Sequence, residues 1–419
     1  VYALGLGSLL QAGDFLAGTP TAGISGAFSI RYDLALDGLS LSLCALTAFL
    51  TAICVVASWE KDFSPGYWAS FLFLEGALMG VFLARDLFVF YVFWEAVLIP
   101  MFFIIGLWGM EGRRHAAMKF FLFTFFGSIF LLIGAVALVT LHHQQTGVWT
   151  WDMTRLRGPG GIAGVLVFAA MALGFAVKIP LVPFHTWLPD AHTEAPAAGS
   201  VMLAGVLLKM GVYGFLRVLW PVFPELTWQL MPWLGALAAI NVIYGAFCAM
   251  AQGDLKRLIA YSSVAHLGFC LMGVLSRTPE GLLGGSLQMI NHGLSTGALF
   301  LLVGFLYDRT HRRGLSDFGD LARRAPWMCF FFGFSTLASI GLPGLNGFVG
   351  EFLSLVGMSR VLPVFALIGV VGVTLSAAYA LPAYQAVFWA EPGEGSVSSR
   401  VTDLDTREKA ILWVLSLSM

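Results

Sequence analysis

Long apolar runs constrain the fold of this chain more than any other feature of its sequence. A helix needs about 20 mostly apolar residues to cross a lipid bilayer. The chain contains eleven such runs, and they are continuous rather than alternating at period two, which excludes a membrane β-barrel. We therefore predict an all-α polytopic membrane protein. The predicted spans are 35–58, 66–84, 87–109, 116–141, 163–187, 197–220, 229–251, 257–276, 282–306, 325–358 and 362–390.

The overall composition agrees with a membrane protein and excludes several soluble classes. Hydrophobic residues make up 58% of the chain and charged residues only 11%, whereas about a quarter of a soluble domain is charged. The 23 basic and 24 acidic residues nearly cancel, so no basic excess is available to bind nucleic acid. The five cysteines lie in apolar stretches without a CxxC pair, so we expect neither a disulfide framework nor a zinc or iron–sulfur site.

Both ends of the sequence look incomplete. An apolar remnant at 1–12 and the beginning of another apolar run at 408–419 flank the eleven spans. The chain begins at Val1 rather than at a methionine, and it stops at Met419 inside the last run. We therefore expect partial helices at both ends.

The basic residues of the loops are divided unequally between the two sides of the membrane. When the loops are numbered alternately, one side carries 14 Lys and Arg residues and the other carries 7. Short loops rich in Lys and Arg stay in the cytoplasm. The predicted cytoplasmic side is therefore the one that carries Lys61, Lys119, Lys256 and Arg313.

Two predicted spans are interrupted by proline. One break follows Lys178, at Pro180 and Pro183, and the other lies at Pro343. A proline inside a helix leaves the carbonyl four residues earlier without its usual donor. Such breaks persist in a membrane only where they are buried in protein or face a water-filled cavity. The carbonyls expected to be freed in this way are those of Ala176, Ile179 and Ser339.

The two breaks recur at a distance that indicates an internal repeat. Pro180 and Pro343 are 163 residues apart, and each lies in the fourth span of a set of five. An odd number of spans inverts the second copy, and paired interrupted helices are typical of inverted-repeat transporters; chance agreement is the alternative. The predicted units are incomplete N-terminal helices at 1–65, a first five-helix repeat at 66–220, a second, inverted five-helix repeat at 229–390, and a loop with the start of the last helix at 391–419.

Five charged residues lie inside the predicted spans, where each one costs about 2.5–3.5 kcal/mol at a helix centre. They are Glu75, Glu95, Lys178, Lys209 and Glu351. Buried ionisable groups can be held near neutrality, so they can load and release a proton. We take the last four as candidates for proton transfer. The alternatives are structural ion pairs, a purely local role at the break for Lys178, and a position near a surface for Glu351.

Three histidines in or beside spans form a second set of candidates. His185, His266 and His292 carry imidazoles, which titrate near neutral pH; simple packing is the alternative for each. The seven-residue spacing between His185 and His192 does not suit a metal site. The sequence also contains no HExxH, Walker A or dinucleotide-binding pattern, so no metal or cofactor site is predicted.

One long segment, in which polar residues interrupt the apolar runs, resembles a known family. Residues 178–200 read KIPLVPFHTWLPDAHTEAPAAGS, and residues 203–214 read LAGVLLKMGVYG. They resemble the antiporter-like membrane subunits of respiratory complex I, a family shared with Mrp-type cation/proton antiporters and membrane-bound hydrogenases. The part at 191–200 resembles the subunit M branch of the bacterial NADH:quinone oxidoreductases, the counterpart of mitochondrial subunit 4. Further matches are LDGLS at 36–40, FWE at 93–95, DLKRLIAYS at 254–262 and GFVGEF at 347–352.

The resemblance implies a fold and a set of roles. The family fold has fourteen helices with two inverted five-helix repeats, so its ends would be missing here. By resemblance, Glu95 pairs with Lys178, Lys209 is the central lysine and Glu351 ends the path of the second half. His266 and His292 would connect the halves. Glu75 matches no family pattern.

The implied function is redox-driven proton translocation by a subunit of NADH:quinone oxidoreductase, a translocase. Quinone reduction elsewhere would alter the pairing of Glu95 with Lys178, and a proton would move through Lys209 toward Glu351. Flavin, iron–sulfur clusters and quinone are expected on partner subunits and none on this chain. The expected partners are other membrane subunits of complex I, including sister antiporter-like subunits, and the lipid of a bacterial inner (plasma) membrane, with no nucleic acid.

Other functions remain open from the sequence. One is a subunit of an Mrp-type sodium/proton antiporter or of a membrane-bound hydrogenase. A stand-alone solute transporter would need a polar substrate pocket, whereas the polar groups within the spans suit protons. A purely structural scaffold would leave the buried charges and the two matched breaks without a reason.

Overall fold

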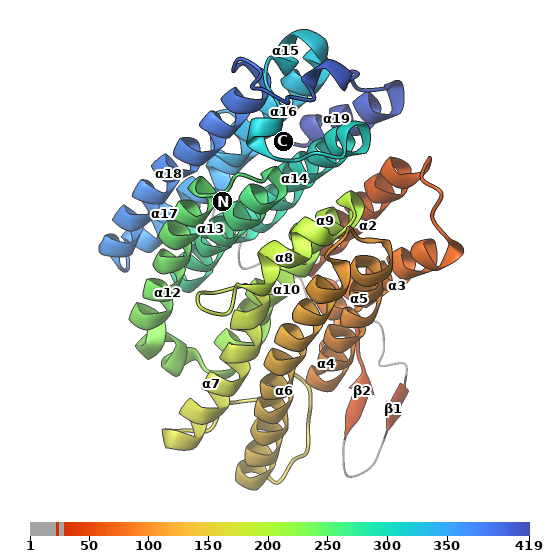
Figure 1. Ribbon diagram of the computed structural model, residues 1–419. Helices are drawn as coiled ribbons and strands as arrows, with labels where there is room; N and C mark the ends of the chain where they lie inside the picture. Colours follow the sequence, from red (N-terminus) through yellow and green to blue (C-terminus); the bar gives the residue numbers. More distant parts are fainter. Residues whose placement is uncertain (1–21, 25–28) are drawn as a thin grey trace.

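The chain folds into a bundle of long helices (Figure 1). The computed structural model describes residues 22–24 and 29–419, so the predicted apolar remnant at 1–12 lies outside the described residues. Within the described part, ten helical segments are long and apolar enough to cross a membrane, which confirms the all-α multi-pass fold. They are α2 (Gly38–Ser58), α3 (Pro65–Leu83), α4 with α5 (Leu87–Trp108), α6 (Arg113–Thr146), α7 (Gly161–Lys178), the run from α9 to α11 (Ala197–Val222), α12 (Pro224–Met250), α13 (Leu255–Leu275), α14 (Pro279–Thr310) and α18 (Pro363–Phe388).

The eleventh predicted span, 325–358, is divided into two half-length helices. Helices α16 (Pro326–Ser339) and α17 (Asn346–Ser359) have 14 residues each, too few for either to cross a bilayer alone. The chain between them turns through Gly341 and Gly344, both with positive φ, which glycine adopts without strain. The predicted second break therefore lies between two half-helices.

The first break ends α7 nine residues before the predicted end of its span. The helix stops at Lys178, and the chain is irregular until α8 begins (Trp187–Glu194). The carbonyl of Ala176, which the sequence predicts to lack its usual helical donor, accepts a hydrogen bond from Leu181 N at 2.9 Å. Asn241 of α12 satisfies two further groups, because its side chain accepts from Val182 N at 2.7 Å and donates to the Pro180 carbonyl at 3.2 Å. Groups within the protein thus provide hydrogen bonds to the backbone of the break, which lipid could not provide.

Short elements complete the fold. The hairpin of β1 (Ala22–Ile24) and β2 (Ile30–Tyr32) pairs Ala22 with Tyr32 in antiparallel register and was not predicted. The C-terminal helix α19 (Thr406–Leu417) packs against α2, α14 and α16. The remaining segments are α4 (Leu87–Ala96), α5 (Leu98–Trp108), α9 (Ala197–Met202), η2 (Leu203–Leu207), α10 (Lys209–Gly214), η3 (Phe215–Leu219), α11 (Trp220–Val222), η4 (Leu315–Asp317), α15 (Leu321–Arg324) and η5 (Ser398–Arg400).

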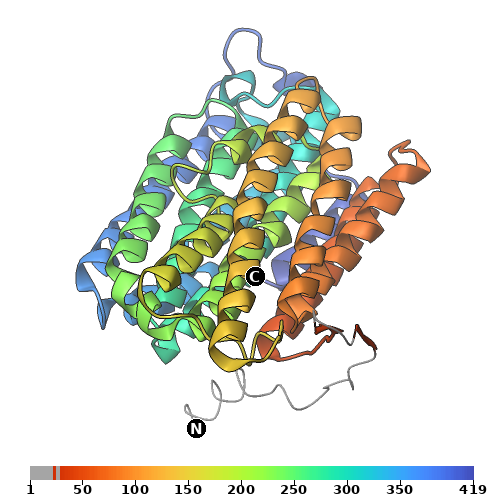
Figure 2. The same ribbon diagram turned by 90° about the horizontal axis from the view of Figure 1, so that it is seen from below.

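Three spans form the centre of the bundle. In the α9–α11 run, α13 and α14, 94% of the most apolar window is buried, whereas the other seven spans are at most 50% buried. Figures 1 and 2 show α2 and α3 at one edge of the bundle and α17 and α18 at the opposite edge. Polar groups on the three central spans are therefore shielded from lipid by protein on both sides.

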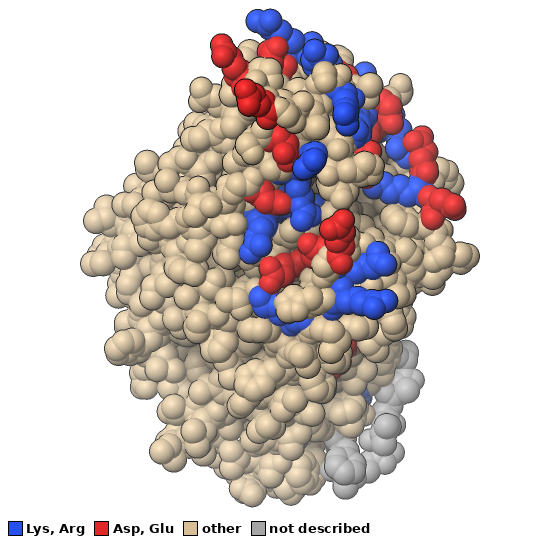
Figure 3. All heavy atoms as spheres, viewed as in Figure 1, with Lys and Arg blue, Asp and Glu red and all other residues tan. Residues whose placement is uncertain are grey.

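The charged surface lies mainly at one end of the molecule (Figure 3), the end that carries α15 and α19 in Figure 1. Ion pairs there include Lys61 with Asp308, Lys119 with Asp190, and Arg309 with Glu408. Among the described residues, each ion pair in a loop or near the end of a span joins two residues from the same predicted side of the membrane. The alternating assignment of loops to two sides thus agrees with the fold. We call the end rich in Lys and Arg the basic face.

Candidate functional site

Lys209 lies at the centre of the bundle, on one of its three most deeply buried spans. Its side chain is completely buried, and its Nζ lies 2.7 Å from Nδ1 of His292 on α14. The amine also donates a hydrogen bond to the carbonyl of Ala204. The lysine that the sequence marks as central therefore contacts a titratable group from the second half of the chain.

A π-helical turn precedes Lys209 and leaves a backbone carbonyl free for its side chain. Residues Leu203–Leu207 form the π-helix η2, in which Leu208 N donates to the Leu203 carbonyl at 3.2 Å rather than to that of Ala204. The Ala204 carbonyl can then accept from the lysine side chain. Single π turns inside α-helices are rare and frequently occur at functional sites. Sequence reasoning missed this turn, because a single glycine, Gly205, is the only irregular residue in it and does not by itself indicate a π turn.

His292 and His266 continue the polar chain toward the second break. The centroids of their rings are 5.5 Å apart, and Nε2 of His292 has no partner among the described residues. No direct hydrogen bond joins the two rings, and both ring nitrogens of His266 lie near other groups, so a water bridging from His292 would have to replace Ser339 at Nε2 of His266. Two of the three predicted histidines thus lie next to each other between the halves.

Glu351 ends this chain, and its carboxylate is held by two neighbours. Its Oε1 lies 3.0 Å from Nδ1 of His266 and accepts from Nε2 of Gln288 at 3.1 Å. The other ring nitrogen of His266, Nε2, lies 3.3 Å from Oγ of Ser339, the last residue of α16. Glu351 is buried, so the alternative position near a surface is wrong.

The second break makes room for the Glu351 carboxylate. Gly341 has φ +73°, and a Cβ added there would lie 2.8 Å from Oε2 of Glu351. That oxygen has no hydrogen-bond partner among the described residues. The glycine therefore has two effects: it allows the positive φ of the turn, and it leaves space beside Oε2 of Glu351.

Glu95 and Lys178 lie in the first half without direct contact. Lys178 is buried, its Nζ has no hydrogen-bond partner, and this nitrogen lies 5.4 Å from the ring centroid of Trp94 and 5.8 Å from that of Phe120. Oε1 of Glu95 also has no partner. The pairing implied by the resemblance is thus not a direct ion pair here, although the two charges interact electrostatically. The aromatic surroundings of Lys178 partly replace a counter-ion.

Glu95 also lies beside a helix irregularity. The span Leu87–Trp108 is interrupted at Val97, where α4 gives way to α5. Pro100 lies four residues after Ala96 and cannot donate to its carbonyl, which explains the interruption. Each of the four candidate charges therefore lies close to a break or a π turn in its helix.

His185 lies in the first break but outside the chain of contacting groups. It is buried, its Nδ1 has no partner, and its ring packs edge-on to Tyr244 with centroids 5.1 Å apart. No described hydrogen bond connects it to Lys178 or Lys209. Packing against tyrosine is therefore its observed role in this structure.

Two buried groups between the halves were missed. Lys256, which the sequence places in a loop, lies in the first turn of α13, is completely buried and donates to the Ala195 carbonyl at 2.7 Å. His192 of α8 stacks on Phe300 with centroids 4.6 Å apart, and neither of its ring nitrogens has a partner. The signal for Lys256 was its position only two residues after the helix N-cap Asp254.

Glu75 is separate from this chain. It lies in the middle of α3, half-buried, next to the exposed side chains of Leu72 and Phe73. No described hydrogen bond or ion pair involves it. Its outward position explains why no candidate group contacts it.

The described part of the chain contains no group of three or more His, Cys, Asp or Glu side chains placed to hold a metal ion. What the arrangement offers is a series of titratable groups across the bundle: Lys209, His292, His266 and Glu351. Each can accept or release a proton, and neighbouring members lie within direct or one-water reach. Such a series suits proton transfer better than binding of a larger solute.

Comparison with known proteins places this geometry in a family. A family model described as NADH:quinone oxidoreductase/Mrp antiporter, TM matches residues 84–376. NADH-quinone oxidoreductase subunit M of Rhodobacter capsulatus is 45% identical over 91% of this chain and 76% of that protein. The subunit M of Escherichia coli strain K12 is 39% identical over 93% of this chain and 78% of that protein.

Solved structures agree with these relatives. A chain of respiratory complex I from Thermus thermophilus aligns over 100% of this chain and 87% of its own length, with a TM-score of 0.84 and 38% identity. A chain of the Mrp complex from Dietzia sp. aligns over 100% of this chain and 86% of its own, with a TM-score of 0.86 but only 21% identity, so it speaks for the fold alone.

Proposed function

The chain belongs to the NADH:quinone oxidoreductase/Mrp antiporter family of membrane subunits, and we propose that it translocates protons as an antiporter-like subunit of an NADH:quinone oxidoreductase. The identities of 39–45% with subunit M proteins favour this assembly over an Mrp antiporter. The observation that carries the proposal is the buried series Lys209, His292, His266 and Glu351.

The cost of burying these groups supports a functional role. Each charged side chain in a span costs about 2.5–3.5 kcal/mol. Two polar atoms of the series, Nε2 of His292 and Oε2 of Glu351, also lack a partner among the described residues. A purely structural network would be expected to satisfy its buried polar groups. Groups that must exchange protons with water need free positions.

The transfer follows from the contacts. A proton on Nζ of Lys209 passes to Nδ1 of His292, which lies within hydrogen-bond distance. Water that replaces Ser339 at Nε2 of His266 carries it from Nε2 of His292 to that nitrogen, and Nδ1 of His266 then releases its own proton to Oε1 of Glu351. The series therefore connects the centre of the α9–α11 span to the second break.

Glu95 and Lys178 would control the proton affinity of the series. Neither group is satisfied by a hydrogen bond at Oε1 or Nζ, so a small displacement could bring them into a direct ion pair. Such a pair would change the electrostatic potential acting on the other buried groups. We assign the trigger for that displacement to quinone reduction elsewhere in the assembly.

The proposal also assigns the cofactors, the partner subunits, the membrane and the internal repeats. We assign flavin, iron–sulfur clusters and quinone to partner subunits, and none to this chain. Its partners would be other membrane subunits, including sister antiporter-like subunits, in a bacterial inner membrane. The units 66–220 and 229–390 would be two inverted repeats, each with one broken helix.

The test is Lys209→Ala in the assembled enzyme in membrane vesicles. Proton uptake driven by NADH is followed with a pH-sensitive dye, while NADH oxidation and assembly are measured in parallel. We expect normal assembly and a loss of proton uptake of at least about tenfold, since positioned proton-transfer groups typically contribute a hundredfold or more. An unchanged number of protons per NADH would overturn the proposal.

A further inference from the structure

A cavity of about 420 Å³ lies in the first half of the chain, at the end of the bundle away from the basic face. Its wall is formed by the start of α2, the end of α3, the loop before α7 and the run from α10 to α11. The start of α2 lies next to β2, on the side opposite α15 and α19 in Figure 1. Sites that bind small molecules have volumes of roughly 300–1,000 Å³. The cavity is therefore large enough for a ligand.

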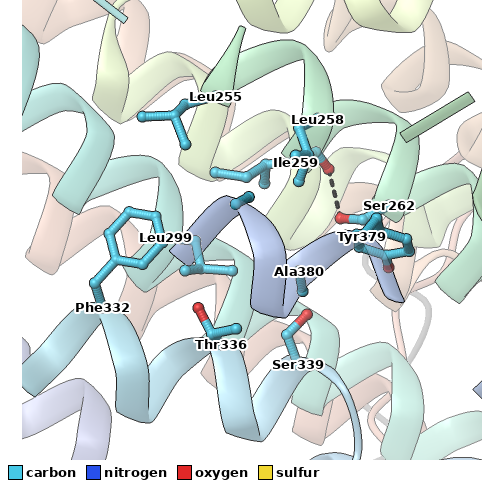
Figure 4. Close-up of a pocket in the computed structure, with 11 residues that line it drawn as sticks. Leu255, Leu258, Ile259, Ser262, Leu299, Phe332, Thr336, Ser339, Tyr379 and Ala380 are labelled. Atoms are coloured by element: carbon cyan, nitrogen blue, oxygen red, sulfur yellow. Dashed lines mark hydrogen bonds between the residues drawn. The ribbon is translucent and has the colours of Figure 1, made fainter. Parts of the chain in front are cut away.

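A second cavity, in the other half of the chain, differs from the first in size and charge. It lies between α13, α14, α16 and α18 and has a volume of about 20 Å³ (Figure 4), little more than the roughly 10–15 Å³ that one water requires. Its described wall contains hydroxyl and apolar side chains but no charged one. The larger cavity is lined by Arg85, Arg157 and Arg217. We call it the arginine cavity.

Three segments that are distant in the sequence bring these arginines together. Arg85 follows the end of α3, Arg157 lies in the loop before α7, and Arg217 lies in η3. The loop is fixed beside α3, because Met153 N donates to the Arg85 carbonyl at 3.0 Å. Only seven Lys and Arg residues are predicted on this side of the membrane, and three of them line this one cavity. Such a concentration on the side that is poor in basic residues requires a reason.

The charge of the arginine cavity is not balanced within the described residues. Asp37 is the only carboxylate among the described lining residues, and it is already paired with Arg217 and caps α2. Arg85 and Arg157 form no ion pair with a described residue. Nη1 of Arg157 donates to two backbone carbonyls of its own loop, which leaves its other guanidinium donors available. Three arginines and one carboxylate leave an excess of two positive charges, which a bound anion would neutralise.

Most of the remaining wall is apolar. Leu36, Phe82, Leu83 and Leu216 line the cavity together with the arginines. An inorganic anion has no use for these side chains, whereas the carbon chains of an amphiphile are stabilised by contact with them. Arg157 is exposed, so the cavity reaches the surface. The cavity also lies where helices end, at the depth of the lipid headgroups.

We propose that the arginine cavity binds the phosphate of an anionic phospholipid from the membrane leaflet on the side away from the basic face. Arg85 and Arg157 hold the phosphate oxygens, for which the guanidinium fork is well suited. The first carbons of the acyl chains lie against Phe82 and Leu216. Arg217 remains paired with Asp37 and contributes its positive charge from the inner end of the wall. Basic pockets between membrane helices bind lipid headgroups by the same chemistry.

The binding test uses the assembled enzyme, solubilised in detergent and freed of lipid. The probe is phosphatidylglycerol with a photoreactive diazirine on an upper acyl carbon, and mass spectrometry locates the peptides to which light attaches it. We expect attachment at residues 82–85 and 213–217. Unlabelled phosphatidylglycerol should displace the probe at about one-tenth of the concentration that phosphatidylcholine needs, because the choline group cancels the negative charge of the headgroup.

Two arginines of the same loop provide a variant and its matched control. Arg157 lines the cavity, whereas Arg155 is equally classed as exposed, does not line it and pairs with Asp152. We expect Arg157→Glu to lower attachment of the probe at least about tenfold, because it replaces a charge-assisted contact by repulsion. Arg155→Glu should leave attachment unchanged. Arg85→Gln is the second variant and should also lower attachment, and native gel electrophoresis checks assembly of all three.

Three outcomes would overturn the lipid site. One is equal attachment of the probe to the Arg157→Glu and Arg155→Glu enzymes. Another is displacement of the probe by inorganic phosphate as readily as by phosphatidylglycerol, which would make free phosphate the ligand. The third is a polypeptide segment in the cavity when the assembled enzyme is imaged by electron cryomicroscopy. Proton uptake is not measured in any of them, so failure of the lipid site leaves the proposed translocation unaffected.

Discussion

Nδ1 of His266 lies 3.0 Å from Oε1 of Glu351, and this contact joins the most buried part of α13 to the helix that resumes after the second break. The two residues are 85 positions apart in the sequence. Gln288 of α14 shares the same carboxylate oxygen at 3.1 Å. Three helices therefore meet at one carboxylate.

The first prediction concerns this contact. If His266 and Glu351 transfer the same proton in sequence, removing both should harm proton uptake no more than removing either one. We expect His266→Leu and Glu351→Gln each to lower NADH-driven proton uptake by at least about tenfold, and the double variant to match the worse single variant. Fully multiplicative losses in this double-mutant cycle would show that the two side chains act independently.

The second prediction separates charge from proton exchange at Lys209. Arginine keeps the positive charge but does not release its proton in proteins. Lys209→Arg should therefore assemble and retain the charge near His292, yet lose proton uptake by about as much as Lys209→Ala, at least about tenfold. Native gel electrophoresis of the assembled enzyme checks assembly, and vesicle acidification checks transport. Normal pumping by the arginine variant would reduce Lys209 to a fixed charge.

The third prediction compares two glutamates that both lie within the membrane. Glu95 interacts electrostatically with Lys178, whereas Glu75 lies half-buried on the outer side of α3 with no described partner. We expect Glu95→Gln to lower proton uptake by about tenfold or more and Glu75→Gln to leave it unchanged. Both rates are measured in the same vesicles with NADH as the donor. Equal losses would mean that any carboxylate in these spans is needed, and the special role of Glu95 would be withdrawn.

The sequence predicts the spans well, because they depend on local composition; the proton-transfer roles of the candidate charges stay predictions. Eleven runs correspond to ten continuous spans and the pair α16 and α17. Lys209, His266, His292 and Glu351 meet in one series, as their positions within spans suggested. The prolines also located both breaks, although the first helix ends at Lys178 rather than at residue 187.

The remaining features depend on contacts between distant segments and on backbone details without a sequence signal. The π turn before Lys209 contains ordinary apolar residues, and the burial of Lys256 follows from packing of α13 against α8. The distance between Glu95 and Lys178 could not be read from their spacing, because it depends on how α4 and α7 face each other around Trp94. Each of these features needs three-dimensional packing to be known.

The last prediction separates the two effects of the glycine at the second break. Gly341 has φ +73° and leaves room for Oε2 of Glu351, whereas Gly344 has φ +101° and no neighbouring atom within 4 Å of an added Cβ. An alanine in a left-handed conformation costs about 1–2 kcal/mol, so Gly341→Ala and Gly344→Ala should both lower the thermal stability of the subunit. Only Gly341→Ala should displace the carboxylate, and we expect it alone to lose proton uptake. Thermal denaturation of the solubilised enzyme and vesicle acidification are measured on both variants. Equal pumping by the two would show that the free face of Glu351 is not needed for transfer, because both variants strain the backbone and only Gly341→Ala contacts the carboxylate.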